Sequence, residues 1–343
     1  MRTIQLFDSR FLLPVVALAL ILLTNLILSP EFFHLEFKDG RLYGSLVDVL
    51  NRSAPCALLA IGMSLVIATG GIDLSVGAVI AITGAVCANL LNSSIDSISL
   101  IVLAGLFVGV VAGAVNGGLV SFFGIQPIVA TLVLMVAGRG IAQLINDGQI
   151  VTFQNPAFAS IGVGSIFGLP SPVVITLGIF LLAQAFVRLT AMGLFIEASG
   201  CNPKASSYIG IPVRTIKWSV YVMSGLCAAV AGMIITADIH GADANNAGLW
   251  LELDAILAVV LGGASLAGGR FSLPLTLIGV LIIQAMTTTI IMSGIDPKFN
   301  LLIKSLIIVT VLLLQSPILR GQIRGFFARK HKAENSAVVE SQS

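Results

Sequence analysis

The chain has 343 residues, of which 57% are hydrophobic, and a formal net charge of +2. Charged residues make up 10% of the chain, whereas a soluble domain carries about 25%. So few charges exclude a water-soluble protein of this size, and the small net charge indicates no nucleic-acid partner. With a mean hydropathy of +1.04 and apolar runs of about 20 residues, the composition predicts an all-α polytopic membrane protein.

The first apolar run, residues 11–28, follows Arg2 and Arg10 and resembles a secretory signal peptide. It is long for one, and SPEFFHLEF offers no small-residue cleavage site after it. We therefore interpret it as an uncleaved first span behind a cytoplasmic N-terminus, residues 1–10. Further spans, about ten in all, are expected at 50–69, 78–91, 98–120, 126–143, 169–187, 215–237, 252–267, 272–291 and 299–316.

The basic residues predict the orientation. With the N-terminus inside, the inside segments hold twelve Lys and Arg and the outside segments six, which favours cytoplasmic ends for the chain. The tail, residues 318–343, is basic and then polar; its basic side chains are Arg320, Arg324, Arg329, Lys330 and Lys332. Residues 11–317 are expected to form one transmembrane domain with short outside connections. The longest inside connection, about 188–214, is polar enough to be ordered in water.

Several enzyme motifs are absent from the sequence. No lysine follows a glycine, so there is no Gly-Lys-Ser/Thr phosphate loop. There is no H-E-x-x-H, and GASLA at 263–267 fails the G-x-S-x-G pattern at its last position. The cysteines have no C-x-x-C spacing and are interpreted as small apolar side chains: Cys56, Cys87, Cys201 and Cys227. We expect neither a catalytic nor a metal site.

Two stretches share one plan: LVIATGGIDLSVGAVIAITG (65–84) and LAVVLGGASLAGGRFSLPLTLIG (257–279). Each is an apolar run, a Gly-Gly break followed by Leu and Ser, and a second apolar run. Glycine-broken segments in corresponding halves of a transporter point to its substrate site. We therefore expect two glycine-broken helical hairpins near the core.

Two polar residues in apolar surroundings admit two interpretations each. Asp73 either caps a helix beginning near Leu74, accepting from the N–H of Val76 or Gly77, or acts on a solute or a proton. Asn116 lies beside a face of glycines at a spacing of four, which is typical of close helix packing but also fits a pore lining; a buried amide there needs a partner or a polar cavity. These glycines are Gly105, Gly109, Gly113 and Gly117.

A second polar group precedes the eighth expected span. Glu252 and Asp254 follow GADANNAGLW (241–250) and either stabilise a helix N-terminus or line a solute path. Asn245, Asn246 and Trp250 adjoin them. Amides, carboxylates and an aromatic face are groups that bind sugar hydroxyls and the C–H face of a sugar.

The loop FIEASGCNPKASSYIGIPV (195–213) is compatible by composition with an inert loop or with a short helix that fits a groove on a cytoplasmic partner. With GGIDLSVG and LELDAILAVVLGGASLAGGR, it resembles the inner-membrane permeases of bacterial ABC importers for simple sugars, the ribose, xylose and galactose branch. The resemblance covers about residues 11–317. Three runs are most similar to the galactofuranose permeases of enteric bacteria: residues 39–55, 129–145 and 241–260. The ribose-type permeases lack the segment ADANNAGLW.

The resemblance implies a transport subunit of the bacterial inner membrane that is not itself an enzyme and binds no cofactor. ATP would be used by a partner ATPase with fused nucleotide-binding domains. A second permease chain, making a heterodimer, and a periplasmic sugar-binding protein would complete the assembly. The ATPase-coupling residues would be Glu197, Gly200, Asn202, Ala205 and Gly210.

The main hypothesis is a conduit whose cavity alternates between the two sides as the ATPase moves the coupling segment. One alternative is another pentose or hexose as the solute. A second is an ion-coupled secondary sugar transporter, with Asp73 or the Glu252–Asp254 pair carrying protons. A third is a structural membrane subunit, which leaves the glycine-broken hairpins unexplained.

Overall fold

The computed structural model describes residues 9–28, 30–38, 40–93 and 97–294, and after these only residues 296, 299, 302, 305, 306, 309 and 310. The chain divides into two compact units, Met1–Thr289 and Ile290–Ser343. The described part of the second unit is the end of helix α12, a turn at residues 293 and 294, and the single residues after it. The tail at 318–343 and most of the tenth expected span lie outside the described residues.

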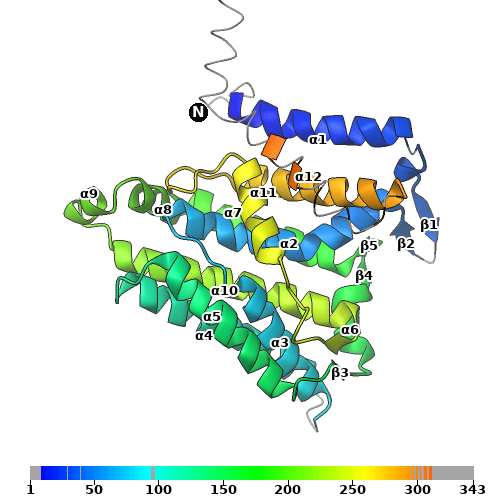
Figure 1. Ribbon diagram of the computed structural model, residues 1–343, viewed down its shortest axis with the longest axis horizontal. Coiled ribbons are helices and arrows are strands. Elements are labelled where there is room, and N and C mark those ends of the chain that lie inside the picture. The colour runs from blue at the N-terminus through cyan, green and yellow to red at the C-terminus, as the bar shows by residue number, and fades with distance from the viewer. Residues whose placement is uncertain are drawn as a thin grey trace, which may run out of the picture. The chain divides into compact units, whose positions relative to one another are not determined.

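The first unit is mainly helical (Figure 1). Its longer helices are α1 (Ser9–Leu28), α2 (Ser45–Ala68), α4 (Ile98–Ser121), α5 (Pro127–Ile145), α7 (Ser171–Leu189), α10 (Val213–Asp238) and α12 (Leu273–Met292). The shorter ones are α3 (Val76–Leu91), α6 (Pro156–Val163), α8 (Met192–Cys201), α9 (Pro203–Tyr208), α11 (Leu251–Leu261) and the 3-10 helix η1 (Pro30–Phe33). The expected span at 252–267 ends early as a helix because Gly263 takes a positive φ of 85° just after α11.

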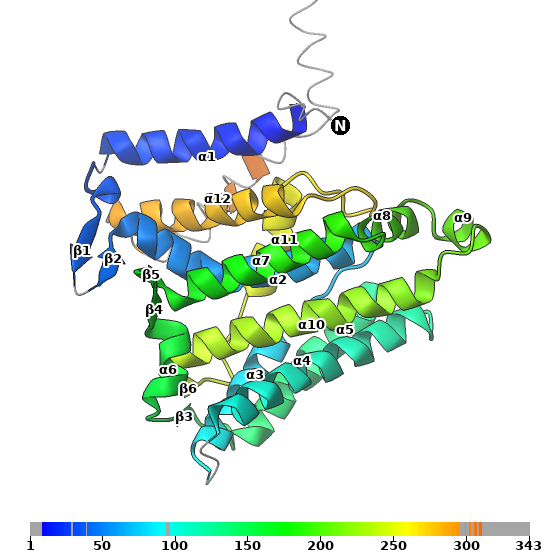
Figure 2. The same cartoon turned by 180° about the vertical axis from the view of Figure 1, so that it is seen from behind.

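Among its described residues, the first unit also has three short antiparallel strand pairs. They join β1 (Glu36–Lys38) to β2 (Arg41–Tyr43), β3 (Val151–Thr152) to β6 (Gly241–Ala242), and β4 (Ser165–Ile166) to β5 (Leu169–Pro170). Figure 2 shows these strands and α6 at one end of the long helices, with α8 and α9 at the other end. The connection between α5 and α7 is ordered and folds into β3, α6, β4 and β5.

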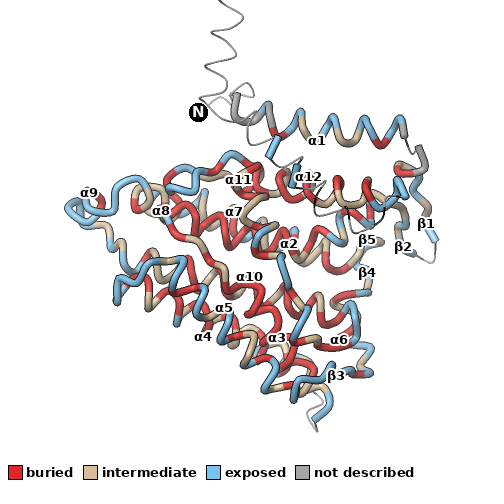
Figure 3. Tube along the Cα trace, in the orientation of Figure 1, coloured by how far each residue is buried: buried red, intermediate tan, exposed pale blue. Residues whose placement is uncertain are grey.

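Helix α10 lies at the centre of the first unit. It packs against α4, α2 and α3, and both ribbon views show it between α7 and the pair α4 and α5. The apolar stretches of α2 and α10 are 78% and 72% buried, whereas those of α4, α5 and α7 are 17–28% buried. Figure 3 shows this division along the trace. In a membrane, α2 and α10 are therefore core helices, and α4, α5 and α7 present apolar faces outward.

The glycine face of α4 packs directly on α10. A Cβ added at Gly109 would lie 2.4 Å from the carbonyl oxygen of Gly225, and one at Gly113 would lie 2.4 Å from that of Tyr221. Such contacts bring the two backbones together with no side chain between them. The packing interpretation of this face is therefore the one that the structure supports.

Within the residues that the structure describes, six helices are long and apolar enough to cross a membrane: α2, α4, α5, α7, α10 and α12. These make the chain a polytopic membrane protein. Helix α3 has 16 residues and is about 24 Å long, which is less than the ~30 Å of a bilayer core. A short helix of this kind reaches only part of the way across, so the expectation of about ten spans stays a prediction.

Candidate functional site

The break between α2 and α3, residues 69–75, carries a carboxylate into the core. Asp73 is only 1% exposed. Its Oδ1 accepts hydrogen bonds from the backbone N–H of Ser75 at 3.1 Å and from the Ser75 hydroxyl at 2.6 Å, and its Oδ2 accepts from the hydroxyl of Ser224 on α10 at 2.8 Å. The prediction that Asp73 accepts from the N–H of Val76 or Gly77 is wrong. Its side chain accepts instead from Ser75, two residues along the chain, and from Ser224 on α10.

Two more polar side chains lie at this break. The Asn116 amide on α4 donates to the Ser75 hydroxyl at 2.7 Å, while its Oδ1 has no hydrogen-bond partner. The Tyr221 hydroxyl on α10 also has none, and a Cβ added at Gly71 would lie 2.6 Å from it. We call Asp73, Ser75, Asn116, Tyr221 and Ser224 the core polar cluster; each is at most 1% exposed.

The core polar cluster joins two helices, α4 and α10, to the break by hydrogen bonds. A buried polar atom without a hydrogen-bond partner lowers stability by about 1–3 kcal/mol. The cluster therefore holds these segments together and also contains atoms that can still gain hydrogen bonds. Because these side chains are covered by protein, none of them faces an open cavity in this conformation. Asp73 and Asn116, which are predicted to lie on a solute path, are therefore buried in this conformation.

The segment between β6 and α11 forms a second group, held against α5. The Asp243 carboxylate accepts from the backbone N–H of Asn245 and Asn246 and from the Asn246 amide. The side-chain oxygen Oδ1 of Asn245 accepts from the side-chain amide of Gln143 on α5 at 2.6 Å. Arg139, one turn earlier on α5, donates to the carbonyl oxygens of Ala244 at 3.2 Å and Ala247 at 2.6 Å.

Glu252 lies buried where α11 begins. It is 2% exposed, its Oε2 has no hydrogen-bond partner, and that oxygen would lie 2.6 Å from a Cβ added at Gly77 on α3. Trp250, just before the helix, is 56% exposed and has the strained positive φ of 67°.

The predicted path residues thus fall into two groups. Asn245, Asn246 and Trp250 are exposed, and Asp254 is half-buried on the first turn of α11. Glu252 joins the buried side. The sequence analysis did not identify Gln143 or Arg139 as site residues. Their spacing of one helical turn on an otherwise apolar span was the available signal.

The predicted coupling residues lie on α8 and α9, between these two helices, and in the turn after α9, so the segment is largely helical. The Asn202 side chain caps α9 by accepting from the Ala205 N–H at 3.0 Å, with Pro203 at the first helical position. Asn202, Ala205 and Gly210 are exposed, and Glu197 is half-buried. Gly200 is different, since it packs on the end of α2, where a Cβ would lie 1.8 Å from the Ala68 carbonyl oxygen.

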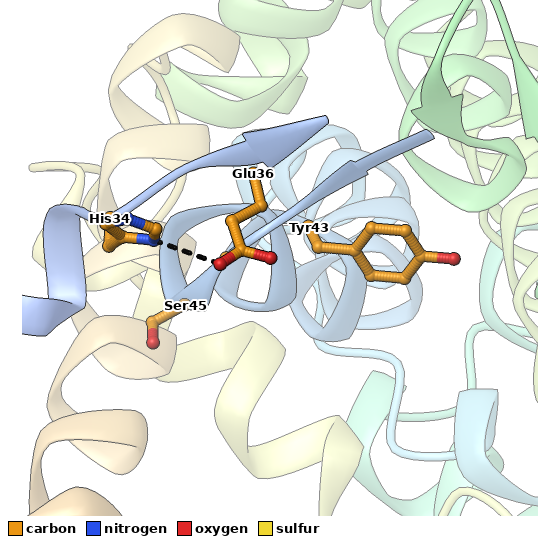
Figure 4. A pocket seen from close by; sticks show the side chains of 5 residues that line it. His34, Glu36, Tyr43 and Ser45 are labelled. Carbon is orange, nitrogen blue, oxygen red and sulfur yellow. Dashed lines mark ion pairs between the residues drawn. The ribbon is translucent and has the colours of Figure 1, made fainter. Parts of the chain in front are cut away.

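The strand end of the first unit carries cavities that the sequence did not predict. One, of about 380 Å³, is lined by His34, Glu36, Tyr43, Gly44 and Ser45 (Figure 4). The figure shows the His34 ring facing the Glu36 carboxylate, 3.8 Å away. The hydrogen bond and charge of Lys38 hold the pKa of Glu36 below its ordinary value. Within the described ranges, no three His, Cys, Asp or Glu side chains are grouped to hold a metal ion.

Comparison with known proteins identifies the family. Residues 45–312 match the family described as "Branched-chain amino acid transport system / permease component". The galactofuranose transporter permease protein YtfT of Escherichia coli strain K12 is 54% identical over 314 residues, 92% of each chain. The fructose import permease protein FruF of Bifidobacterium longum is 38% identical over 91% of this chain and 89% of its own length.

The ribose import permease protein RbsC of Haemophilus influenzae is 36% identical over 86% of this chain and 90% of its own length. No solved structure matches the chain significantly. The match to these permeases covers almost their whole length. Membrane-spanning helices, such as those found here, are the part that a permease contributes to a transporter. The chain therefore belongs to the family of permease components described above, and it is an inner-membrane subunit of an ABC transporter.

Proposed function

We propose that the chain is the permease subunit of an ATP-driven importer that moves galactofuranose across the bacterial inner membrane. The observation that carries this proposal is the 54% identity to a galactofuranose permease over 92% of both chains. The ribose and fructose permeases reach 36% and 38%. The solute is thus a monosaccharide, and another pentose or hexose is the second candidate.

The solute path in this proposal runs along the exposed group of polar residues. The amides of Asn245 and Asn246 would bind sugar hydroxyls, and the exposed indole of Trp250 would cover the C–H face of the ring. The buried side chains of Asp73, Asn116 and Glu252 would not contact the sugar but would stabilise the helices that form the wall of the path. Asp254, on the first turn of α11, would contribute at its rim.

The topology in this proposal has about ten spans, cytoplasmic ends and two glycine-broken hairpins near the core. Residues 11–317 form one permease domain, followed by a cytoplasmic tail at 318–343. The segment about 188–214 then faces the cytoplasm and couples the permease to the ATPase through Glu197, Gly200, Asn202, Ala205 and Gly210. The supporting observation is that α9 is a capped, exposed helix at the end of the long helices opposite the strands.

The partners in this proposal are an ATPase with fused nucleotide-binding domains, a second and similar permease chain, and a periplasmic sugar-binding protein. ATP is hydrolysed by the ATPase, and this chain binds no cofactor. Substrate affinity resides mainly in the binding protein.

The test begins with purification of the tagged chain from its host in mild detergent and identification of what co-purifies. Reconstitution of that assembly in liposomes should give ATP-dependent uptake of galactofuranose in preference to ribose, fructose, xylose and galactose, when each is supplied with its binding protein. Preference for one of the other sugars would contradict the substrate assignment. Uptake by the chain alone, without ATP and abolished by a protonophore, would replace the proposal with a secondary carrier.

A further inference from the structure

Three segments that are distant in sequence meet at the C-terminal end of α2. These are the last residues of α2, the end of α8, and the glycine-rich connection 262–272 between α11 and α12. The Gly269 N–H donates a hydrogen bond to the Ala68 carbonyl oxygen at 2.9 Å. A Cβ added at Gly200 would lie 1.8 Å from that same oxygen and 2.6 Å from the Gly269 nitrogen. Only glycine fits at position 200 without displacing backbone.

The neighbouring contacts are equally close. A Cβ added at Gly268 would lie 2.9 Å from the Gly70 nitrogen and 3.2 Å from the Gly200 carbonyl oxygen. On its other face, α8 buries Ile196 completely, in one apolar cluster with Leu65 of α2 and Val220 of α10. Because backbone meets backbone here, with no flexible side chain between, α8 and the end of α2 are held as one body.

That body continues directly into the break that carries Asp73. The chain passes from Ala68 through Gly70 and Gly71 to Asp73, and Tyr221 packs in the same apolar cluster as Ile196 while its hydroxyl lies against Gly71. The orphaned Tyr221 hydroxyl and Asn116 Oδ1 both lie in the core polar cluster at this break. If the break is displaced, these two buried atoms can therefore gain hydrogen bonds that they lack in this conformation.

We propose that Gly200, Ala68 and Gly269 form a rigid joint that carries the displacement of α8 into the break between α2 and α3. Gly200 is then a positioning residue for transport, distinct from the exposed residues of α9 that meet the ATPase. The joint deepens the proposed function and rests on it. It assigns to α8 the inward transmission of movement, and to α9 the outward contact.

The first test compares Gly200→Ala with Gly178→Ala in the complete transporter, reconstituted in liposomes with the sugar-loaded binding protein. Gly178 lies on α7, and nothing lies within 4 Å of a Cβ added there. We expect the Gly200→Ala complex to assemble and hydrolyse ATP, with at least a tenfold loss of sugar moved per ATP hydrolysed. Gly178→Ala should match the unaltered chain. An unchanged transport ratio for Gly200→Ala would overturn the joint.

The second test does not depend on how Gly200→Ala folds. A Cβ at position 269 would lie 2.9 Å from the Cys201 sulfur, close to the ~3 Å that separates these atoms across a disulfide. In Gly269→Cys, copper phenanthroline should oxidise this pair of thiols to a disulfide. A rigid joint predicts that transport continues in the cross-linked protein. Transport that stops on oxidation and returns with dithiothreitol would show sliding at this contact and overturn the proposal.

The control for the second test combines Gly269→Cys with Cys201→Ser. It carries the same backbone strain at position 269, where φ is 98°, and cannot form the cross-link. Its transport should be insensitive to the oxidant. An unaltered chain that binds no ATPase would remove the proposed function itself, and this outcome is seen before any variant is made.

Discussion

Asp73 accepts hydrogen bonds from the hydroxyls of Ser75, in the helix break, and Ser224, on α10. Substitutions at this position can therefore test the role of its charge separately from the role of its hydrogen bonds. We expect Asp73→Asn to retain stability and uptake within about twofold, because the amide oxygen can still accept from Ser75 and the Ser224 hydroxyl can rotate to accept from the amide. Asp73→Leu should lose about 2–4 kcal/mol, since it orphans buried donors on both sides.

The measurements are the melting temperature of the purified protein in detergent and sugar uptake in reconstituted liposomes. The two variants form a matched pair, because both remove the carboxylate and only one removes the hydrogen bonding. If Asp73→Asn melts like the unaltered chain but abolishes uptake, the carboxylate itself acts on the sugar or on a proton. That result would favour the direct role left open by the sequence.

Trp250 is a second residue at which stability and transport can be separated. Its positive φ strains a residue with a side chain by about 1–2 kcal/mol, and its indole is mostly exposed. Trp250→Gly should therefore raise the melting temperature and, because it removes the aromatic wall of the path, lower sugar uptake at least fivefold. His240→Gly is the control, since His240 is also exposed at a positive φ of 53° but belongs to no predicted path. Equal uptake by both variants would remove Trp250 from the path.

At the scale of elements, α9 depends on a single capping residue. Asn202→Arg removes the cap, worth about 1 kcal/mol, and places a long cation on the surface proposed to meet the ATPase. We expect it to abolish transport while leaving membrane insertion intact, as measured by uptake and by the amount of protein in washed membranes. Asn202→Asp keeps a capping oxygen and should retain the packing of α9. Normal uptake by Asn202→Arg would contradict the coupling role of this helix.

The elements also show what the sequence could predict and what it could not. Apolar runs of about 20 residues located the long helices, because burial in lipid requires length and composition rather than a detailed pattern. Helix α6 was missed, although Asn155 followed by Pro156 is a helix-start signal, and the Asn155 side chain does cap α6. The split between buried Glu252 and exposed Asn245 was not predictable, since it depends on α3 and α5 packing against a segment far along the chain.

At the scale of the whole molecule, the proposed orientation can be tested at two exposed aromatic residues. Phe167, between β4 and β5, is 98% exposed, and Tyr208, at the end of α9, is 89% exposed. In a Cys201→Ser background, Phe167→Cys should react with a membrane-impermeant maleimide added outside spheroplasts, and Tyr208→Cys should react only after lysis. The remaining cysteines are buried and give a low background. The reverse pattern would invert the topology.

The hydrogen bond between Asp73 and Ser224 spans 151 residues of sequence, and this separation has a consequence for biogenesis. At a synthesis rate of about 5–20 residues per second, the ribosome completes Ser224 roughly 8–30 s after Asp73. During that interval α3, at 16 residues too short to hold a transmembrane position alone, has been made without α10, the helix that later covers it. The nascent chain must therefore be sheltered by the membrane insertion machinery until α10 arrives. Cells depleted of insertase should lose this protein by proteolysis of chains stalled before α10.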